Sequence, residues 1–224
     1  MLMEKFIYWA EVSCDLVLLN LLWLFCCLPI VTIGASTTAM HYVVRKMAMG
    51  EPYKVWSGFW GSFKGNWKQS SIMFLILVIL AAICGADFYI GSQVVGGLGL
   101  ACQVIGILGL ILTVCVLTLV FPLLARYTQS IPALLKSALL LSMTNPHVVI
   151  AGCAATLLFP ALVLLNESFL VIATPAWLLV GGTLAALTVQ LMLKPVYARL
   201  EKSIPMEEMN HGDSETETDR KSVV

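Results

Sequence analysis

Five long apolar runs, none of which contains a lysine or an arginine, constrain this chain more than any other feature. The runs cover residues 16–33, 72–90, 100–124, 148–165 and 175–193. About 20 apolar residues are enough for a helix to cross the roughly 30 Å hydrocarbon core of a bilayer. The runs do not alternate between apolar and polar residues as barrel strands do. The sequence therefore predicts an all-α, polytopic membrane helical bundle with about five transmembrane helices.

The composition favours a membrane domain over a soluble one. Hydrophobic residues make up 59% of the chain and charged residues 12%, and the mean hydropathy is +0.91. These values leave too little polar surface to cover a soluble domain. We assign residues 1–202 to one membrane domain. Residues 203–224 are dense in charge and poor in apolar side chains, so we predict a disordered polar cytoplasmic tail there.

The positions of the cations predict the orientation of the chain. Short loops that carry Lys and Arg stay on the cytoplasmic side. Twelve of the 13 Lys and Arg residues follow the first, third or fifth run, and only Lys5 precedes the first. We therefore expect the N-terminus outside and the C-terminus in the cytoplasm. A re-entrant first segment is the alternative, because Pro29, Thr32 and Gly34 interrupt its end; it would leave four spans and an N-terminus inside.

An aromatic stripe marks the connection after the first run. Five aromatic rings recur at helical spacing and share one face of the segment: Trp56, Phe59, Trp60, Phe63 and Trp67. Cations on the other faces make this segment amphipathic, so we expect an interfacial helix with rings at headgroup depth and cations toward lipid phosphates. The alternative is a helix that grips a cytoplasmic partner. The candidate interfacial or partner-contact residues are Trp56, Phe59, Trp60, Phe63, Lys64, Asn66 and Trp67.

Two shorter helices are predicted on the same side of the membrane. Ser36 or Thr37 would cap a helix that reaches Met49. After the third run, Ser130 would cap a second amphipathic helix, which ends before Asn145 and the proline that follows it.

Patterns that would indicate catalysis or metal binding are missing. The sequence has no Walker loop, HExxH, GxSxG or dinucleotide glycine pattern. Its seven cysteines and three histidines lack ligand spacing. The middle of each apolar run holds no ionisable Asp, Glu, Lys or Arg, which argues against a proton-driven transporter or an ion pump. We predict no enzymatic activity, no cofactor and no metal, with the lipid bilayer rather than nucleic acid as the partner.

Three strings carry a family resemblance: LNLLW at 19–23, LPIVTIGASTTAMHYVVRK at 28–46 and FWGSFKGNWKQS at 59–70. Together they resemble the YesL family of bacterial integral membrane proteins, which shares this first span, the proline and threonine-glycine turn, the Arg-Lys pair and the aromatic segment. The candidate structural residues of this motif are Asn20, Trp23, Pro29, Thr32, Gly34, Arg45 and Lys46.

The resemblance implies a multi-pass protein of the bacterial plasma membrane. Members of the family are often encoded beside carbohydrate ABC importers, so it also implies an accessory or regulatory component of carbohydrate ABC uptake, with transporter components as partners. The sequence lacks the EAA-type loop with which a permease subunit docks on its ATPase. A small autonomous carrier and a structural envelope protein are the alternatives, and the sequence fixes neither a substrate nor an oligomeric state.

Overall fold

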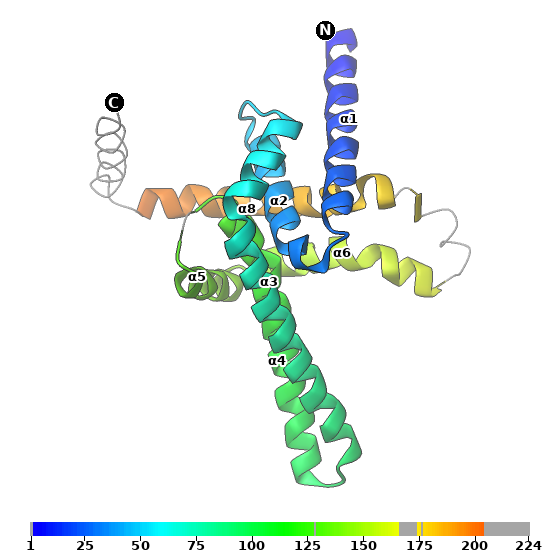
Figure 1. Ribbon diagram of the computed structural model, residues 1–224, viewed down its shortest axis with the longest axis vertical. Helices are drawn as coiled ribbons and strands as arrows, with labels where there is room; N and C mark the ends of the chain where they lie inside the picture. The colour runs from blue at the N-terminus through cyan, green and yellow to red at the C-terminus, as the bar shows by residue number, and fades with distance from the viewer. Residues whose placement is uncertain (1, 128, 166–173, 176, 204–224) are drawn as a thin grey trace. The chain divides into compact units, whose positions relative to one another are not determined.

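A computed structural model describes residues 2–127, 129–165, 174–175 and 177–203, and every regular element in these ranges is helical. In chain order the elements are α1 (Leu2–Cys26), the 3-10 turn η1 (Ile30–Thr32), α2 (Ile33–Met49), α3 (Val55–Gln93), α4 (Gly97–Leu124), α5 (Ile131–Thr144), α6 (Pro146–Leu165), the π-helical turn η2 (Trp177–Gly181) and α8 (Gly182–Ser203) (Figure 1). The all-α prediction is confirmed for this part of the chain. The predicted polar tail lies outside the described residues, apart from Ser203 at the end of α8.

Two compact units divide the chain, residues 1–191 and residues 192–224. The second unit is described only as the last turns of α8, which end at Ser203. All contacts reported below lie within the first unit.

Three helices in the described ranges are long and apolar enough to cross a membrane. They are Val55–Gln93, Gly97–Leu124 and Trp177–Arg199. The count rises to four when Ile131–Thr144 and Pro146–Thr156, which meet at a bend of 96°, are taken as one broken span. The predicted runs 72–90, 100–124 and 175–193 correspond to the three unbroken candidates, and run 148–165 lies within α6. A count of five is not confirmed.

The first predicted span is interrupted near its end. Helix α1 ends at Cys26, and α2 begins at Ile33. Between them Pro29 has an extended backbone (φ −78°, ψ 122°), and proline also disfavours a helical conformation of the residue before it. Residues 16–33 therefore do not form one continuous helix. Instead α1 and α2 reverse direction and form a hairpin (Figure 1).

Thr32 closes the break between α1 and α2. Its hydroxyl lies 2.7 Å from the carbonyl oxygen of Cys26 and 2.8 Å from that of Pro29, and it donates to this pair. The last carbonyl groups of a helix have no partner within the helix. The threonine therefore satisfies the end of α1 at the point where the chain turns toward α2.

The predicted caps of α2 are wrong, because their hydroxyl groups bind α1 instead. Helix α2 starts at Ile33, before Ser36 and Thr37. Ser36 Oγ donates to the carbonyl oxygen of Trp23 at 2.9 Å, and Thr37 Oγ1 accepts from Trp23 Nε1 at 3.2 Å. The predicted end at Met49 is confirmed, and Gly50 follows it in the left-handed region (φ 72°), which glycine adopts without strain.

Helix α3 runs for 39 residues without a break. At about 1.5 Å per residue, this is roughly 58 Å, almost twice the hydrocarbon core. The aromatic segment predicted as a separate interfacial helix is the first part of this helix. The apolar run 72–90 continues from it within the same helix. Helix α4 returns beside α3 after a short turn at Gly96 (Figure 1).

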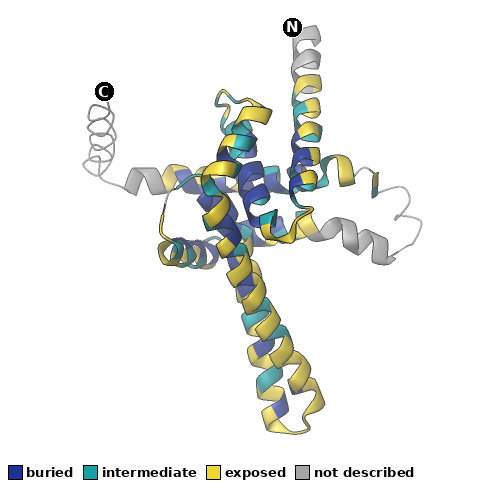
Figure 2. Ribbon diagram, in the orientation of Figure 1, coloured by how far each residue is buried: buried dark blue, intermediate teal, exposed yellow. Residues whose placement is uncertain are grey.

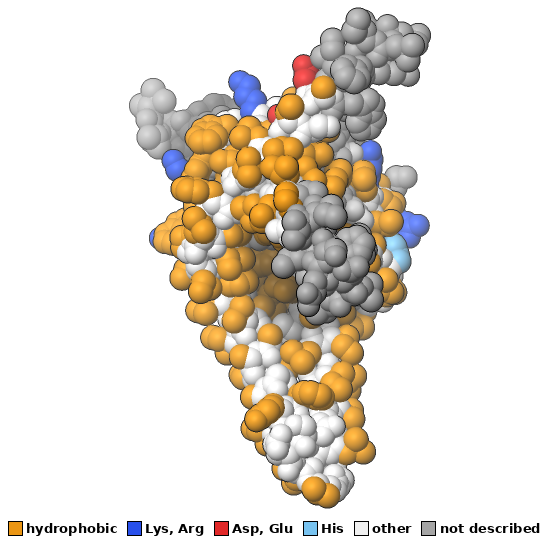
Figure 3. Space-filling model, turned by 90° about the vertical axis from the view of Figure 1, so that its right-hand side faces the viewer, with side chains coloured by type: hydrophobic (Ala, Val, Ile, Leu, Met, Phe, Trp, Pro, Cys, Tyr) orange, Lys and Arg blue, Asp and Glu red, His pale blue; other side chains and the backbone are white. Residues whose placement is uncertain are grey.

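Side chains from α1, α2, α3 and α8 form one buried hydrophobic cluster in the core of the first unit. Figure 2 shows burial concentrated on α2 and the adjoining turns, whereas the far end of the α3–α4 hairpin is mostly exposed. The residues of the cluster are Leu19, Leu22, Cys26, Ala39, Met40, Val43, Val44, Val55, Phe59 and Ala186. Hydrophobic side chains also dominate the visible face of the hairpin in Figure 3. Such a surface suits a hydrocarbon solvent.

The α3–α4 hairpin is held by small residues that let two backbones approach. A Cβ atom added to Gly106 of α4 would lie 2.7 Å from the carbonyl oxygen of Cys84 in α3. Close approach at small residues is a usual basis of helix packing in membranes, where burial from water supplies little driving force.

A second close approach joins the start of α2 to the middle of α3. A Cβ atom added to Gly34 would overlap the carbonyl oxygen of Ser70 and lie 2.8 Å from the Cβ atom of Phe74. One turn further along α2, Thr38 Oγ1 and Ser70 Oγ form a buried hydrogen bond of 3.0 Å. Glycine at position 34 is therefore required for this helix pair.

Gly34→Ala is expected to destabilise the protein by about 1–3 kcal/mol, because the added methyl group meets backbone atoms that have little freedom to move. The measurement is the midpoint of thermal unfolding in a mild detergent. Gly61→Ala is the matched control, since a Cβ atom there meets nothing within 4 Å. The control should be neutral or more stable by roughly 0.5–1 kcal/mol. Equal midpoints for the two variants would contradict the close approach.

Candidate functional site

The aromatic stripe of α3 is divided between the protein core and the surface. Phe59 is fully buried, whereas Trp56 and Trp67 are 60% and 45% exposed. Trp60 and Phe63 are half-buried and pack against the core. The sequence grouped all five rings on one face, but the structure turns the middle of the stripe toward α1 and α2 and leaves its two ends exposed.

Edge-to-face contacts connect the rings along α3. The ring centroids of Trp56 and Trp60 are 6.0 Å apart, and those of Trp60 and Phe63 are 5.5 Å apart. Phe59 and Trp60 meet at 5.8 Å with perpendicular planes. Such pairs stabilise by about 0.5–1.5 kcal/mol beyond the area they bury. The contacts therefore order the exposed Trp56 ring through Trp60, which packs on the core.

The polar candidates on α3 have separate environments. Lys64 is exposed. Asn66 Nδ2 donates to the carbonyl oxygen of Ser62 at 3.1 Å, within the same helix. Asn66 therefore supports its own helix rather than a neighbouring one in this structure.

Asn20 joins α1 to the segment where η2 passes into α8. Its Nδ2 donates to the carbonyl oxygen of Leu178 at 2.7 Å, and its Oδ1 accepts from the backbone N–H of Thr183 at 3.0 Å. The asparagine side chain is fully buried. A π-helical turn leaves backbone groups without their usual partners, so Asn20 satisfies two of them at once.

Charged side chains of the motif gather where α2 gives way to α3. Arg45 Nη1 forms a salt bridge of 3.1 Å with Glu51 Oε1. Lys46 Nζ lies 5.2 Å from the centroid of the Tyr42 ring. Tyr53 Oη donates to Asp15 Oδ2 of α1 at 2.9 Å. We call residues 42–58 the cationic turn.

Two buried polar contacts of α2 were missed by the sequence analysis. One is the Thr38–Ser70 hydrogen bond described above. The other joins His41 to Gln190 of α8. Gln190 Nε2 lies 3.3 Å from the His41 carbonyl oxygen and 3.5 Å from His41 Nδ1. The spacing of Gly34, Thr38 and His41 on one face of α2 is a signal that could have pointed to these contacts.

Burial lowers the pKa of His41 from its ordinary value of 6.5 to about 3. The cause is desolvation, which disfavours the charged imidazolium. His41 is therefore neutral at physiological pH. With Gln190 Nε2 facing Nδ1, the ring nitrogen that accepts is Nδ1 and the proton belongs on Nε2.

The motif residues gather in one region of the first unit. Among the described residues, no three His, Cys, Asp or Glu side chains lie close enough together to hold a metal ion. What the geometry brings together is the α1–α2 hairpin, the cationic turn and the two exposed tryptophans of α3.

Long apolar helices with polar groups paired between them define this chain as a multi-pass helical membrane protein. The model of the family described as "Protein of unknown function, DUF624" matches residues 16–88, which hold all the motif residues discussed above. The chain is 31% identical over 156 residues to "Uncharacterized protein YesL" of Bacillus subtilis (strain 168), and the match covers 68% of this chain and 73% of that protein. The chain belongs to the YesL-like family. No solved structure matches it significantly.

The lowered pKa of His41 predicts a stability that depends on pH. Because the folded state disfavours protonation, the stabilisation is complete above about pH 6.5 and is lost as the pH falls toward 3. The wild type should lose free energy of unfolding between pH 7.5 and pH 4.5. His41→Asn should reduce this loss by roughly 2 kcal/mol. The measurement is unfolding by denaturant at the two pH values.

His147→Asn is the control for this experiment, because His147 is exposed at the start of α6. This variant should retain the full pH dependence of the wild type. A wild-type protein whose acid sensitivity is unchanged by His41→Asn would contradict the assignment.

Proposed function

We propose that this chain is an accessory or regulatory component of a carbohydrate ABC uptake system in the bacterial plasma membrane. It contacts a transporter subunit through the exposed edge of the first part of α3. Two observations support the role: the family resemblance implies genes encoded beside carbohydrate ABC importers, and the first part of α3 has an exposed surface.

The exposure of Trp56 and Trp67 carries this proposal. Both rings are large apolar groups without full cover from the chain itself, at 60% and 45% exposure. Lys64 and Lys68 are exposed on the same helix, and the exposed Lys54 directly precedes it. Tryptophan is enriched among the contact residues that dominate binding energy. An interfacial role toward lipid headgroups is the competing explanation for such a stripe.

The length of α3 favours a protein contact over simple anchoring. About 20 of its 39 residues are enough to cross the hydrocarbon. When the apolar run 72–90 occupies the bilayer, the first turns of α3 continue beyond it by up to roughly 25 Å. Trp56 then lies farther from the hydrocarbon than Trp67 does, at a depth that a partner on the cytoplasmic side can reach.

For the topology we favour the re-entrant α1–α2 hairpin with four spans and both termini in the cytoplasm. The turn between the two helices is apolar yet open, with Leu28, Ile30 and Val31 exposed by 66–76%. A turn of this kind fits hydrocarbon better than water. The Tyr53–Asp15 hydrogen bond brings the cationic turn beside α1, and the positive-inside rule assigns that turn to the cytoplasm.

A protease site fused before Met1 tests the topology. With the N-terminus inside, cleavage occurs in inverted membrane vesicles and not in intact spheroplasts. The same site fused after Val224 is the control and should follow the same pattern. Cleavage of the N-terminal site in intact spheroplasts would instead support an outside N-terminus and a fully crossing first segment.

Copurification tests the proposed partner contact. The protein extracted from its own bacterium in mild detergent should retain subunits of a carbohydrate ABC importer. Trp56→Ala with Trp67→Ala should reduce the retained importer at least about tenfold, because tryptophan truncation at a contact centre typically costs 2 kcal/mol or more. Quantitative mass spectrometry of the eluate is the measurement.

Leu75→Ala with Ile79→Ala is the matched control, since these side chains are 58% and 51% exposed on the apolar part of the same helix. The control should retain the importer. Sugar flux by the purified wild-type protein alone in liposomes would contradict the accessory role and support an autonomous carrier.

A further inference from the structure

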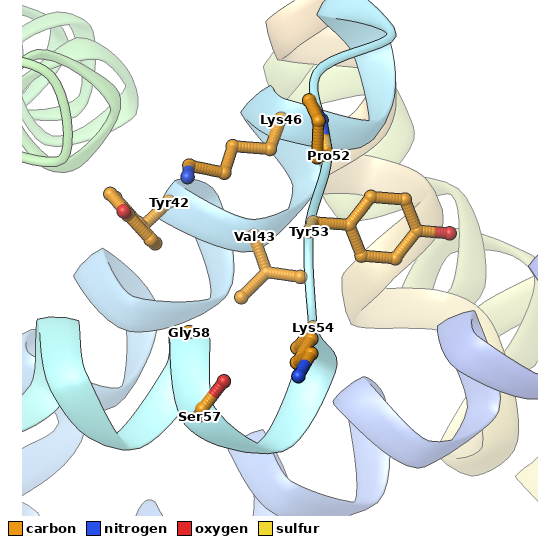
Figure 4. Close-up of a pocket in the computed structure, with 8 residues that line it drawn as sticks. All are labelled: Tyr42, Val43, Lys46, Pro52, Tyr53, Lys54, Ser57 and Gly58. Carbon is orange, nitrogen blue, oxygen red and sulfur yellow. The ribbon is translucent and has the colours of Figure 1, made fainter.

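An open pocket of about 440 Å³ lies between the last turns of α2 and the first turn of α3. Figure 4 shows Lys46 of α2 reaching toward Tyr42, with Lys54 just before α3 and Ser57 on its first turn. The lining residues are Tyr42, Val43, Lys46, Pro52, Tyr53, Lys54, Ser57 and Gly58. Two are cations and none is an acid.

Two acids next to the pocket are already engaged outside its lining. Glu51 forms the salt bridge with Arg45, and Asp15 accepts the hydrogen bond from Tyr53. Within the described ranges no carboxylate forms an ion pair with Lys46 or Lys54. The pocket is therefore a concave surface with two positive charges.

Further donors lie at the start of α3, which forms one wall of the pocket. The Ser57 hydroxyl is exposed there. The backbone N–H of Gly58 bonds the carbonyl oxygen of Lys54, which makes it the first closed hydrogen bond of α3. The N–H groups before Gly58 have no carbonyl partner within the helix and carry the positive end of its dipole. They add to the lysine charges in favouring an anion.

The Tyr42 ring holds Lys46 at the edge of the pocket. A separation of 5.2 Å between the ammonium and the ring centroid is within the range of a cation–π contact. This contact leaves the three N–H donors of the ammonium free to turn toward a ligand. An anion would then meet Lys46 from α2 and Lys54 with Ser57 from α3.

We propose that this pocket binds a phosphate group, supplied by the headgroup of an anionic lipid or by a soluble phosphate compound. Phosphate presents several acceptor oxygens at once, which matches two lysines, a hydroxyl and helix N–H groups. The pocket does not depend on the proposed transporter partner.

Native mass spectrometry of the detergent-purified full chain tests the lipid source. The protein is mixed with phosphatidylglycerol and phosphatidylcholine of identical acyl chains, and bound lipid is counted. The wild-type protein should retain phosphatidylglycerol in preference to phosphatidylcholine. Lys46→Gln with Lys54→Gln should weaken this binding by about fivefold for each lysine.

Lys64→Gln with Lys68→Gln is the matched control, because it removes the same charge from exposed sites on α3 outside the pocket. It should change phosphatidylglycerol binding less than about twofold. Equal losses in the two double variants would overturn the proposal, since they indicate diffuse attraction rather than a site.

Calorimetric titration with inorganic phosphate tests the soluble source. Phosphate binding that is lost with Lys46 and Lys54, together with no preference for phosphatidylglycerol, supports the site and assigns it to a soluble phosphate compound. The proposed site is overturned if the wild-type protein does not bind inorganic phosphate and binds phosphatidylglycerol no better than phosphatidylcholine.

Ser57→Asp tests whether a loss of anion binding could come from a loss of folding. An acid in the first turn favours the helix, yet it places a negative charge where the phosphate would lie. This variant should unfold at or above the wild-type temperature and lose anion binding at least fivefold. Ser57→Asn is its neutral control, and anion binding that survives Ser57→Asp would contradict the assigned position.

Discussion

The close approach of Gly34 to the backbone of Ser70 is the constraint on which the arrangement of α2 and α3 depends. It lets two helices meet without intervening side chains, and the Thr38–Ser70 hydrogen bond then fixes their register. With that register set, the end of α2 faces the beginning of α3. The cationic turn and its pocket lie where these two helix ends meet. Lys46 of α2 and Lys54, just before α3, lie on opposite sides of the pocket.

Polar side chains connect the remaining helices of the first unit. Asn20 satisfies the π-helical turn, and Gln190 bonds the buried His41 from α8. In an apolar solvent such hydrogen bonds contribute roughly 0.6–2 kcal/mol each, and small residues supply the close packing that burial from water does not. The described polar contacts therefore act mainly as connections between helices, and the neutral state of His41 is a consequence of the same packing.

The continuity of α3 separates two roles within one helix. Its apolar part lies beside α4 and exposes the surface expected in hydrocarbon. Its first part carries Phe59 into the core and leaves Trp56 and Trp67 exposed. A stripe of rings on one face was read from the sequence as lying flat in the interface. In the structure the stripe and the apolar run belong to one unbroken helix, so the five rings are spread along its first part. The interfacial placement of the stripe stays a prediction.

The sequence by itself determined the helical class, the strongly apolar segments, the end of α2 and the family, because hydropathy, helix stop signals and short motifs are local features. It also placed Thr32 and Gly34 at the interruption of the first run. Only the tertiary structure decided that Phe59 is buried, that Ser36 and Thr37 bind α1 rather than cap α2, and that His41 meets Gln190. These outcomes depend on which helices pack together across as many as 149 positions of sequence, and a local pattern can mark a contact face but does not name its partner.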